Sequence, residues 1–477
     1  MSACSLGRGH PTATLTVLSL AGFGYSLLSS AVVPALPAIG HSLSVTESDV
    51  SWLLTAYLLS AAVGTAILGR LGDMYGKQRM LVWTLVVLAA GTLLGALASS
   101  LAVLIAARVI QGAAGGIFPL SFGIVRDEFP PERVAGGIGL ISAVLGIGGA
   151  VGVIAGGLIV AHLDWHWLFW IPLIVIGAAA VGTWRLVPES PVRVGGRVNW
   201  LAVLLMSTGV SSLLLAISEA TTWGWASPRT LALLAAGFAI CCAWVVVETS
   251  SPEPLIDMTM MRIRGAWTTN VSAFLLGAGM YSSFIIFPQF AQLPRSTGFG
   301  FGASVLLSGV YLLPSCIGVA IAGFAAGWIA NQFGSKRALI VGSGVTASSF
   351  GLLAAFHGHP YDMLISAALL GVGIGLAFAA LGNLIVQAVP LDQTSAAGGM
   401  NTVMRMVGGA LGAQLAATLI AIHTEDGLPA VTGFTEAFML GAGLLVVCTL
   451  SALLIPGGKA RRASAQEIEP ALTLIES

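Results

Sequence analysis

Fourteen apolar runs, each about 20 residues long, dominate the sequence of 477 residues. A helix needs about 20 mostly apolar residues to cross the hydrocarbon core of a bilayer, whereas a membrane strand alternates apolar with polar residues. The chain is therefore predicted to be an all-α polytopic membrane protein. The expected spans are Thr14–Ala38, Ser48–Leu71, Arg79–Ala98, Leu101–Val125, Ala135–Ala161, Leu168–Leu186, Trp200–Ser218, Arg229–Val247, Ala266–Phe287, Ala303–Ala330, Arg337–Phe356, Tyr361–Val389, Ser395–Ile422 and Phe434–Ile455.

The composition excludes a large soluble enzyme. Charged residues make up 8% of the chain and the mean hydropathy is +0.94, whereas soluble domains contain about 25% charged residues. The five cysteines form neither a disulfide framework nor a metal-ligand spacing. The sequence also lacks a Walker-type phosphate loop, a catalytic triad and a basic patch for nucleic acid. We therefore expect no enzyme activity, no metal, no cofactor and no nucleic-acid partner.

The basic residues fall almost entirely on one set of alternate loops. The opposite loops hold only Arg229 and Arg295, while Arg108 and Arg405 lie within spans. Cytoplasmic loops carry an excess of Lys and Arg, so the richer set and both termini are predicted to be cytoplasmic. The basic residues of this set are Arg8, Arg70, Lys77, Arg79, Arg126, Arg133, Arg185, Arg193, Arg197, Arg262, Arg264, Lys336, Arg337, Lys459, Arg461 and Arg462.

Glycine landmarks recur along the chain at a nearly constant offset. This offset spans eight helices, so the two copies have the same orientation, which is a known plan of transporters. We predict a six-helix bundle over 1–190, two inserted helices over 191–260, a second six-helix bundle over 261–458 and a cytoplasmic tail over 459–477. The recurrences, at offsets of 258 to 260, are Gly69/Gly327, Gly76/Gly334, Arg79/Arg337, Gly112/Gly371, Gly116/Gly375, Gly148/Gly408 and Gly152/Gly412.

Seven short motifs carry a resemblance to a known family. The stretch from Gly69 to Arg79 resembles the loop signature between helices 2 and 3 of the major facilitator superfamily. All seven resemble, in order, landmarks of its fourteen-helix drug:proton antiporters: SWLLTAYLLS, GRLGDMYGKQR, ARVIQGAAGG, WHWLFW, TWGWASP, EPLIDM and RMVGGALG. The resemblance covers essentially the whole chain, and it implies the major facilitator fold of two rocking bundles.

The resemblance also implies a conformational latch on the cytoplasmic face. In this family the acid that matches Asp73 faces a helix N-terminus of the other half, so Asp73 is expected to contact the chain near Ser395. The helix dipole would favour a carboxylate there by about 0.3–1 kcal/mol when exposed. The repeat carries no acid at the matching place, so the two latches should be unequal. The latch residues are Gly69, Asp73, Gly76, Lys77, Arg79, Asn331 and Arg337.

Two roles stay open for the charges of this loop. Lys77 and Arg79 would order the loop of a latch, but cytoplasmic anchoring by the positive-inside rule explains them equally simply. For these two residues we favour anchoring, and for Asp73 we favour the latch.

Two arginines lie where charge is costly. Arg108 is about seven residues into its span, or roughly 10 Å along a helix, and Gln111 shares its face. The resemblance assigns Arg108 to proton coupling and Gln111 to a central cavity; the alternative is an arginine that snorkels to the surface. For Arg405, a role in proton coupling and a structural role both remain open. We expect adaptable polar and aromatic side chains in the cavity, or else packing between helices: Tyr57, Gln111, Met280, Tyr281, Gln289 and Tyr311.

The fifth span carries a pattern that bears on transport direction. Gly148, Gly152 and Gly156 are four residues apart, so they form one smooth strip that permits close helix packing. With Gly139 and Gly157 they match the antiporter signature, whose strip packs against the other half and is associated with export. Val153 replaces the proline of the signature. Ordinary packing with no bearing on direction is the alternative.

The first span departs from the family pattern. Leu28, Ser30 and Val33 stand where the family often has an acid, a threonine and an asparagine. No acid lies clearly in mid-membrane elsewhere, so the proton site is not evident from the sequence. Asp127 is one candidate, although a solvated charge at a helix end is the simpler interpretation.

We therefore predict a monomeric exporter of the cytoplasmic membrane, in contact with the lipid bilayer. Its substrate would be a small hydrophobic drug or natural product, exchanged for protons by alternating access. Two alternatives remain: a dedicated transporter of a single metabolite, and a transporter-like receptor or scaffold that moves no solute.

Overall fold

The computed structural model describes residues 11–456 except 194, 196, 253 and 426–427; the predicted tail lies outside this range. Within the described residues, fourteen helices or helix pairs are long and apolar enough to span a membrane, as predicted. The elements are α1 (Pro11–Ala31), η1 (Val33–Ala35), α2 (Leu36–Leu43), α3 (Glu47–Tyr75), α4 (Lys77–Ala96), α5 (Leu101–Ala113), α6 (Ile117–Glu128), α7 (Pro131–His162), α8 (Trp167–Leu186), α9 (Trp200–Ser218), α10 (Ala220–Trp223), α11 (Pro228–Ser250), α12 (Met258–Met261), α13 (Arg264–Gln292), η2 (Arg295–Thr297), α14 (Val305–Phe333), α15 (Ser335–Ala355), α16 (Pro360–Ala388), η3 (Leu391–Gln393), α17 (Thr394–Ile422), β1 (Thr424–Glu425), β2 (Leu428–Pro429) and α18 (Val431–Leu453).

Local sequence explains where the helices begin and end. The Ser100, Asn199 and Ser227 side chains accept hydrogen bonds from backbone N–H groups at the starts of α5, α9 and α11. Such caps satisfy donors that a helix leaves unpaired at its start. Gly76 and Gly334 adopt φ of 109° and 83°, which non-glycine residues rarely adopt, and each lets two helices meet at a sharp turn.

Two predicted single helices are interrupted. The first span ends as α1 at Ala31 and continues through η1 and α2, where Pro34 and Pro37 each remove a backbone donor. The fourth span divides into α5 and α6 around residues 114–116, where i→i+3 hydrogen bonds replace the α-helical pattern. A glycine pair allows this tight turn beside α3, because a Cβ at Gly115 would lie 2.8 Å from the carbonyl oxygen of Ala61.

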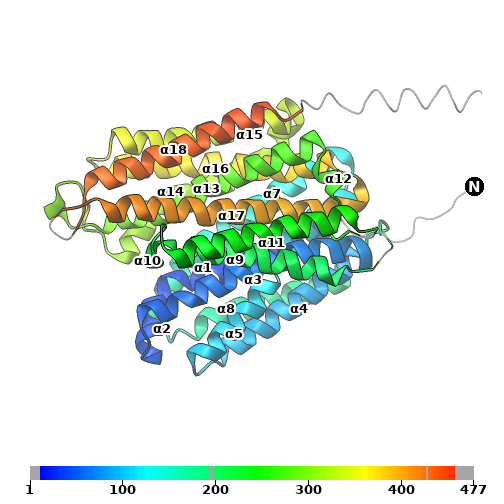
Figure 1. The fold of residues 1–477 in the computed structure, drawn as a ribbon, viewed down its shortest axis with the longest axis horizontal. Helices are drawn as coiled ribbons and strands as arrows, with labels where there is room; N and C mark the ends of the chain where they lie inside the picture. The colour runs from blue at the N-terminus through cyan, green and yellow to red at the C-terminus, as the bar shows by residue number, and fades with distance from the viewer. Residues whose placement is uncertain (1–10, 194, 196, 253, 426–427, 457–477) are drawn as a thin grey trace, which may run out of the picture.

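The helices pack as two groups that meet along a long seam (Figure 1). In the first group α1 packs on α7, α3 on α5 and α4 on α8; in the second, α13 packs on α17, α14 on α16 and α15 on α18. The seam joins α7 to α14 and α3 to α17. For brevity the first group (α1–α8) is called the N half and the second (α13–α18) the C half. The domain boundaries themselves remain a prediction.

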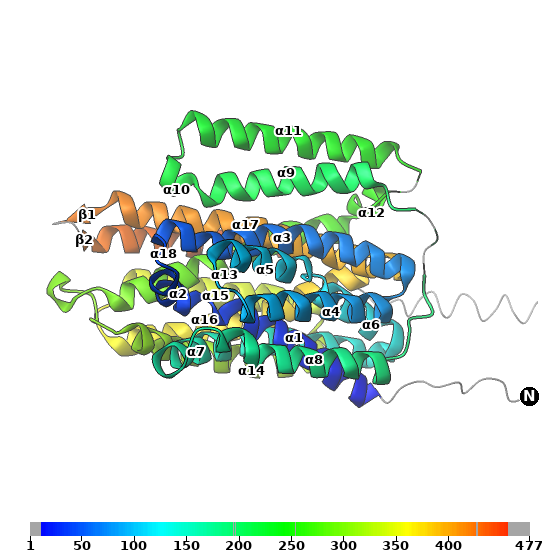
Figure 2. The same cartoon turned by 90° about the horizontal axis from the view of Figure 1, so that it is seen from below.

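The inserted helices α9 and α11 form a hairpin on the outside of the bundle (Figure 2). α9 contacts both α3 and α17, so the hairpin lies over the seam between the halves. At one end of α17, Trp225 donates a 2.8 Å hydrogen bond to Thr418, and Thr221 donates one of 3.2 Å to Gln414. The first and last described residues lie at the other end of the bundle (Figure 1). We call this end, which carries most of the basic loops, the basic end.

The predicted glycine strip of the fifth span does not contact the other half. Gly148, Gly152 and Gly156 pack against α1 within the N half, and Gly157 has no neighbour there. Gly139 alone of the five faces α14, where a Cβ would lie 3.0 Å from the carbonyl oxygen of Gly323. The interpretation of the strip as an inter-half contact was wrong. Positions separated by four share one face of α7, and position 139 lies on another face.

Replacing Gly152 with leucine is expected to destabilise the protein. An ideal Cβ at this position would lie 2.7 Å from the carbonyl oxygen of Leu27, so α1 and α7 would have to separate. Overpacking of this kind costs about 1–3 kcal/mol. We expect Gly152→Leu to lower the melting temperature of the purified protein in detergent. Gly157→Leu is the matched control on the same helix, and an equal loss in both variants would contradict the packing account.

Candidate transport site

Arg108 is fully buried between three helices of the N half. Its Nε donates a 3.1 Å hydrogen bond to the carbonyl oxygen of Leu53, and its Nη1 donates one of 3.0 Å to Gln111 Oε1. Gln111 Nε2 in turn donates to the carbonyl oxygen of Gly91 at 3.1 Å. The guanidinium carbon lies 4.1 Å from the centre of the Tyr57 ring. Arg108 therefore does not snorkel, and it joins α3, α4 and α5.

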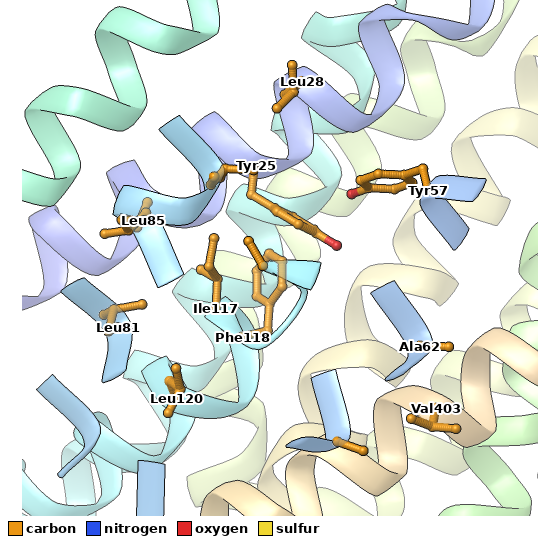
Figure 3. Close-up of a cluster of buried hydrophobic side chains, with 14 of the residues drawn as sticks. Tyr25, Leu28, Tyr57, Ala62, Leu81, Leu85, Ile117, Phe118, Leu120 and Val403 are labelled. Carbon is orange, nitrogen blue, oxygen red and sulfur yellow. The ribbon is translucent and has the colours of Figure 1, made fainter. Parts of the chain in front are cut away.

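An aromatic cluster adjoins this arginine. The rings of Tyr25 and Tyr57 are 6.2 Å apart, and Tyr25 meets Phe118 edge-on at 5.9 Å. Figure 3 shows the hydroxyls of both tyrosines directed towards the space between α1 and α3. Tyr57 was among the predicted cavity residues, but Tyr25 was not. Nothing in its local sequence, which is a plain apolar run, marks Tyr25 as different from other helix-packing residues.

Arg405 is a buried cation of the C half. Its side chain is 8% exposed, and its guanidinium carbon lies 4.1 Å from the centre of the Phe378 ring. Its Nε has no hydrogen-bond partner among the described residues. Tyr281 packs against Gly409, one helical turn from Arg405. Tyr25 lies close enough to both arginines to interact with their charges. The two buried cations therefore share an aromatic environment that spans both halves.

The other residues expected in the cavity are distributed unevenly. Met280 is buried in the core of the C half, and the Tyr311 ring packs 5.9 Å from that of Phe301. Gln289 is exposed near one end of α13. Met280 and Tyr311 therefore pack between helices, which was the alternative to a place in the cavity.

Asp73 contacts the N-terminus of α17 across the seam. Its carboxylate accepts hydrogen bonds from the N–H groups of Ser395, at 3.2 Å, and Ala396, at 2.9 Å. The contact lies where the resemblance implied, and Asp73 is only 1% exposed. A carboxylate at this place is favoured by the helix dipole, by up to about 2 kcal/mol when partly buried. Gly69 lets α3 approach, because a Cβ there would lie 3.0 Å from the Ser395 carbonyl carbon.

Lys77 is buried and not anchored at the surface. Its Nζ lies 3.6 Å from Asp73 Oδ1 and 2.5 Å from Asp127 Oδ2, and none of the three side chains is exposed. Ser190 also donates a hydrogen bond to Asp127. The interpretations of Lys77 as an anchor and of Asp127 as a solvated charge were therefore wrong. Both carboxylates and the amine belong to one buried cluster within the N half.

Arg126 makes a second contact across the seam that the sequence did not single out. It donates hydrogen bonds to the carbonyl oxygens of Val389, at 2.8 Å, and Pro390, at 3.2 Å, and to Thr394 Oγ1, at 2.6 Å. These acceptors lie between α16 and α17. Together with Asp73, Arg126 holds the start of α17 from two sides.

At the repeat of the latch, Asn331 stands in place of the acid and makes one hydrogen bond across the seam. Asn331 is exposed and donates one 2.9 Å hydrogen bond to the carbonyl oxygen of Glu132, at the start of α7. Gly327 makes the close approach here, since a Cβ would lie 2.9 Å from Gly136 N. Arg337 is exposed, whereas its neighbour Lys336 donates to the carbonyl oxygens of Leu453 and Ile455 at the end of α18.

Arg79 lies outside the buried cluster. Its side chain is 67% exposed and approaches Glu189 to 3.6 Å. Glu189 accepts hydrogen bonds from the backbone N–H groups of Gln78 and Arg79 at the start of α4. Its carboxylate also lies against Gly76, where a Cβ would come within 2.6 Å. Arg79 thus belongs to a surface contact that fixes the loop, and we assign it little energy because exposed ion pairs contribute about 0–1 kcal/mol.

Comparison with known proteins identifies the class. The model of the Major Facilitator Superfamily matches residues 18–413 and 269–475, and the chain belongs to this family. Two solved structures share the fold: the human organic anion transporter MFSD10, with a TM-score of 0.67 and 16% identity, and the proton:xylose symporter XylE, with 0.66 and 13%. The alignments cover 93% and 94% of this chain, and 99% and 96% of those chains.

Curated relatives are drug-resistance and export proteins. The tetracenomycin C resistance and export protein of Streptomyces glaucescens is 29% identical over 88% of this chain and 78% of its own length. A multidrug resistance protein B homolog of Mycobacterium tuberculosis is 28% identical over 80% and 71%. The multidrug transporter protein MdtP of Bacillus subtilis is 28% identical over 84% and 74%.

Removing the charge of Asp73 is expected to loosen the basic end. Asp73→Asn keeps the shape of the side chain but loses its attraction to Lys77 and to the α17 dipole. We expect a cysteine at buried Thr402, in a background without native cysteines, to react about tenfold faster with an impermeant maleimide applied from the basic end. Asn331→Ala, at the repeat, is the comparison variant and should raise the rate less, because it removes one exposed hydrogen bond. A rate unchanged by Asp73→Asn would contradict the latch.

Proposed function

We propose that the chain is a secondary active transporter that exports hydrophobic compounds across the cytoplasmic membrane in exchange for protons. The observation that carries this proposal is the closure of the basic end by polar contacts across the seam. Asp73 and Arg126 hold the start of α17 through hydrogen bonds, which can be exchanged for water when the halves separate. The drug-export names of the relatives support the direction and the substrate class.

Alternating access would use the two seam contacts as unequal gates. The contact at α17 has a buried carboxylate and a half-buried arginine that donates to carbonyl oxygens, whereas the contact at α7 has one exposed amide hydrogen bond. Opening of the basic end would break both. The Arg108 and Tyr57 group on one side of the seam, and Arg405 on the other, would then be reached from the cytoplasm.

Proton coupling has two sets of candidate residues. The family resemblance assigns the role to Arg108, which has no carboxylate among the described residues that it contacts. The carboxylates of Asp73 and Asp127 flank Lys77, and a proton on Asp73 would weaken its attraction to Lys77 and to α17. Such a proton would favour opening of the basic end, which links protonation to the exchange of substrate.

The setting follows from the same proposal. Both termini would be cytoplasmic, the protein would act as a monomer in the lipid bilayer, and it would need neither a cofactor nor enzymatic turnover. The excess of Lys and Arg on one set of loops supports this orientation.

Transport into inside-out vesicles tests the proposal. A panel of lipophilic dyes and drugs would be offered before and after collapse of the pH gradient. We expect gradient-dependent uptake by the wild type and loss of uptake in Arg108→Ala, because that variant leaves buried acceptors at Leu53 and Gln111 unpaired. Arg185→Ala, at an exposed position beside Trp184, should retain uptake.

Each other outcome favours an alternative. Uptake that ignores the pH gradient would contradict proton coupling. Saturable uptake of one compound alone would favour a dedicated metabolite transporter. No uptake of any compound would contradict the multidrug assignment and favour a receptor or scaffold.

A further inference from the structure

The buried charges at mid-membrane depth are positive. The acidic side chains of the described residues all lie in connecting segments or within two turns of a helix end. Arg405, by contrast, is the twelfth residue of the 29-residue helix α17, roughly 17 Å from its start. An ionised group at this depth is costly and ordinarily has a partner of opposite charge. Within the described chain, Arg405 forms no ion pair.

Arg405 differs from Arg108 in what surrounds it. Arg108 donates to Leu53 and Gln111 and is held in place by these acceptors, and only its Nη2 is without a partner among the described residues. Arg405 has Phe378 on one face of its guanidinium, and its buried Nε lacks a hydrogen-bond partner. A ring face attracts a cation but accepts none of its in-plane hydrogen bonds. Arg405 therefore presents an unused fork of donors beside the seam.

We propose that the transported compound is a hydrophobic acid that binds as an anion, with its carboxylate on Arg405. This inference rests on the proposed export function and names its substrate class. Guanidinium donors match a carboxylate in geometry and charge, and such charge-assisted hydrogen bonds are stronger than neutral ones. The anion would supply the negative charge that Arg405 lacks among the described residues.

The aromatic neighbours define the rest of the ligand. The rings of Phe378, Tyr281 and Tyr25 lie near Arg405, and we expect them to contact the apolar body of the ligand; the tyrosines add hydroxyl groups. A lipophilic cation would meet two arginines and, among the described residues, no carboxylate at this depth, so it would be repelled. The structure thus favours aromatic carboxylic acids over the amines of the same scaffold.

A matched set of fluorescent probes tests this inference by binding alone. Pyrenebutyric acid, pyrenebutanol and pyrenebutylamine share one aromatic body and differ in charge. We expect the purified wild type in detergent at neutral pH to bind the acid about tenfold or more tightly than the alcohol, and the amine weakest. In Arg405→Gln the affinity for the acid should fall to that of the alcohol, whose own affinity should hardly change.

Two further variants separate charge from structure. Arg405→Lys keeps the charge and should retain part of the preference for the acid. Arg229→Gln, at an exposed position, should retain all of it. Equal binding of acid and alcohol by the wild type would overturn the inference, as would failure to bind the acid or a preference that survives in Arg405→Gln.

The result is independent of the transport assay. Binding of the acid at Arg405 without gradient-driven uptake would leave this site standing and remove proton-coupled export. Gradient-driven uptake of dyes with no preference for acids would leave proton-coupled export standing and remove the site at Arg405.

Discussion

A carboxylate of the N half, that of Asp73, accepts hydrogen bonds at the N-terminus of α17 and so joins the two halves at the basic end. The arrangement of the charges around Asp73 lets this contact break and form again. Lys77, the counter-ion of Asp73, lies two residues beyond the end of α3 and stays within the N half, as does Asp127. When the halves part, the buried ion cluster can move as a unit. Asp73 itself then loses only its two N–H hydrogen bonds and the attraction of the dipole, and it keeps Lys77 as its counter-ion.

The seam also depends on the absence of side chains. Gly69 brings α3 against Ser395 of α17, and Gly327 brings α14 against Gly136 of α7. The two close approaches occupy equivalent places in the repeated sequence, 258 positions apart. Their polar contacts differ, since an acid accepts two N–H groups in one and an amide donates to a carbonyl in the other. The two sites thus combine equivalent helix packing with unequal hydrogen bonding.

The sequence predicted the features that depend on local composition and missed those that depend on three-dimensional neighbours. Fourteen spans follow from run length, and the position of the Asp73 contact follows from a motif. The burial of Lys77 could not be read from its place beside a loop, because it needs Asp127, 50 residues away. Likewise, four-residue spacing shows that Gly152 shares a face with its neighbours in the strip, but not that this face meets α1.

The hairpin of α9 and α11 has a mechanical consequence for a bundle whose halves move. Its hydrogen bonds to Gln414 and Thr418 join it to α17 at the end remote from the latch, while α9 packs against α3. A rocking motion would therefore carry the hairpin with the C half and make it slide over α3. It would cover the widening seam on that side and keep lipid tails out of it. The α7–α14 side would then be the flank in direct contact with lipid.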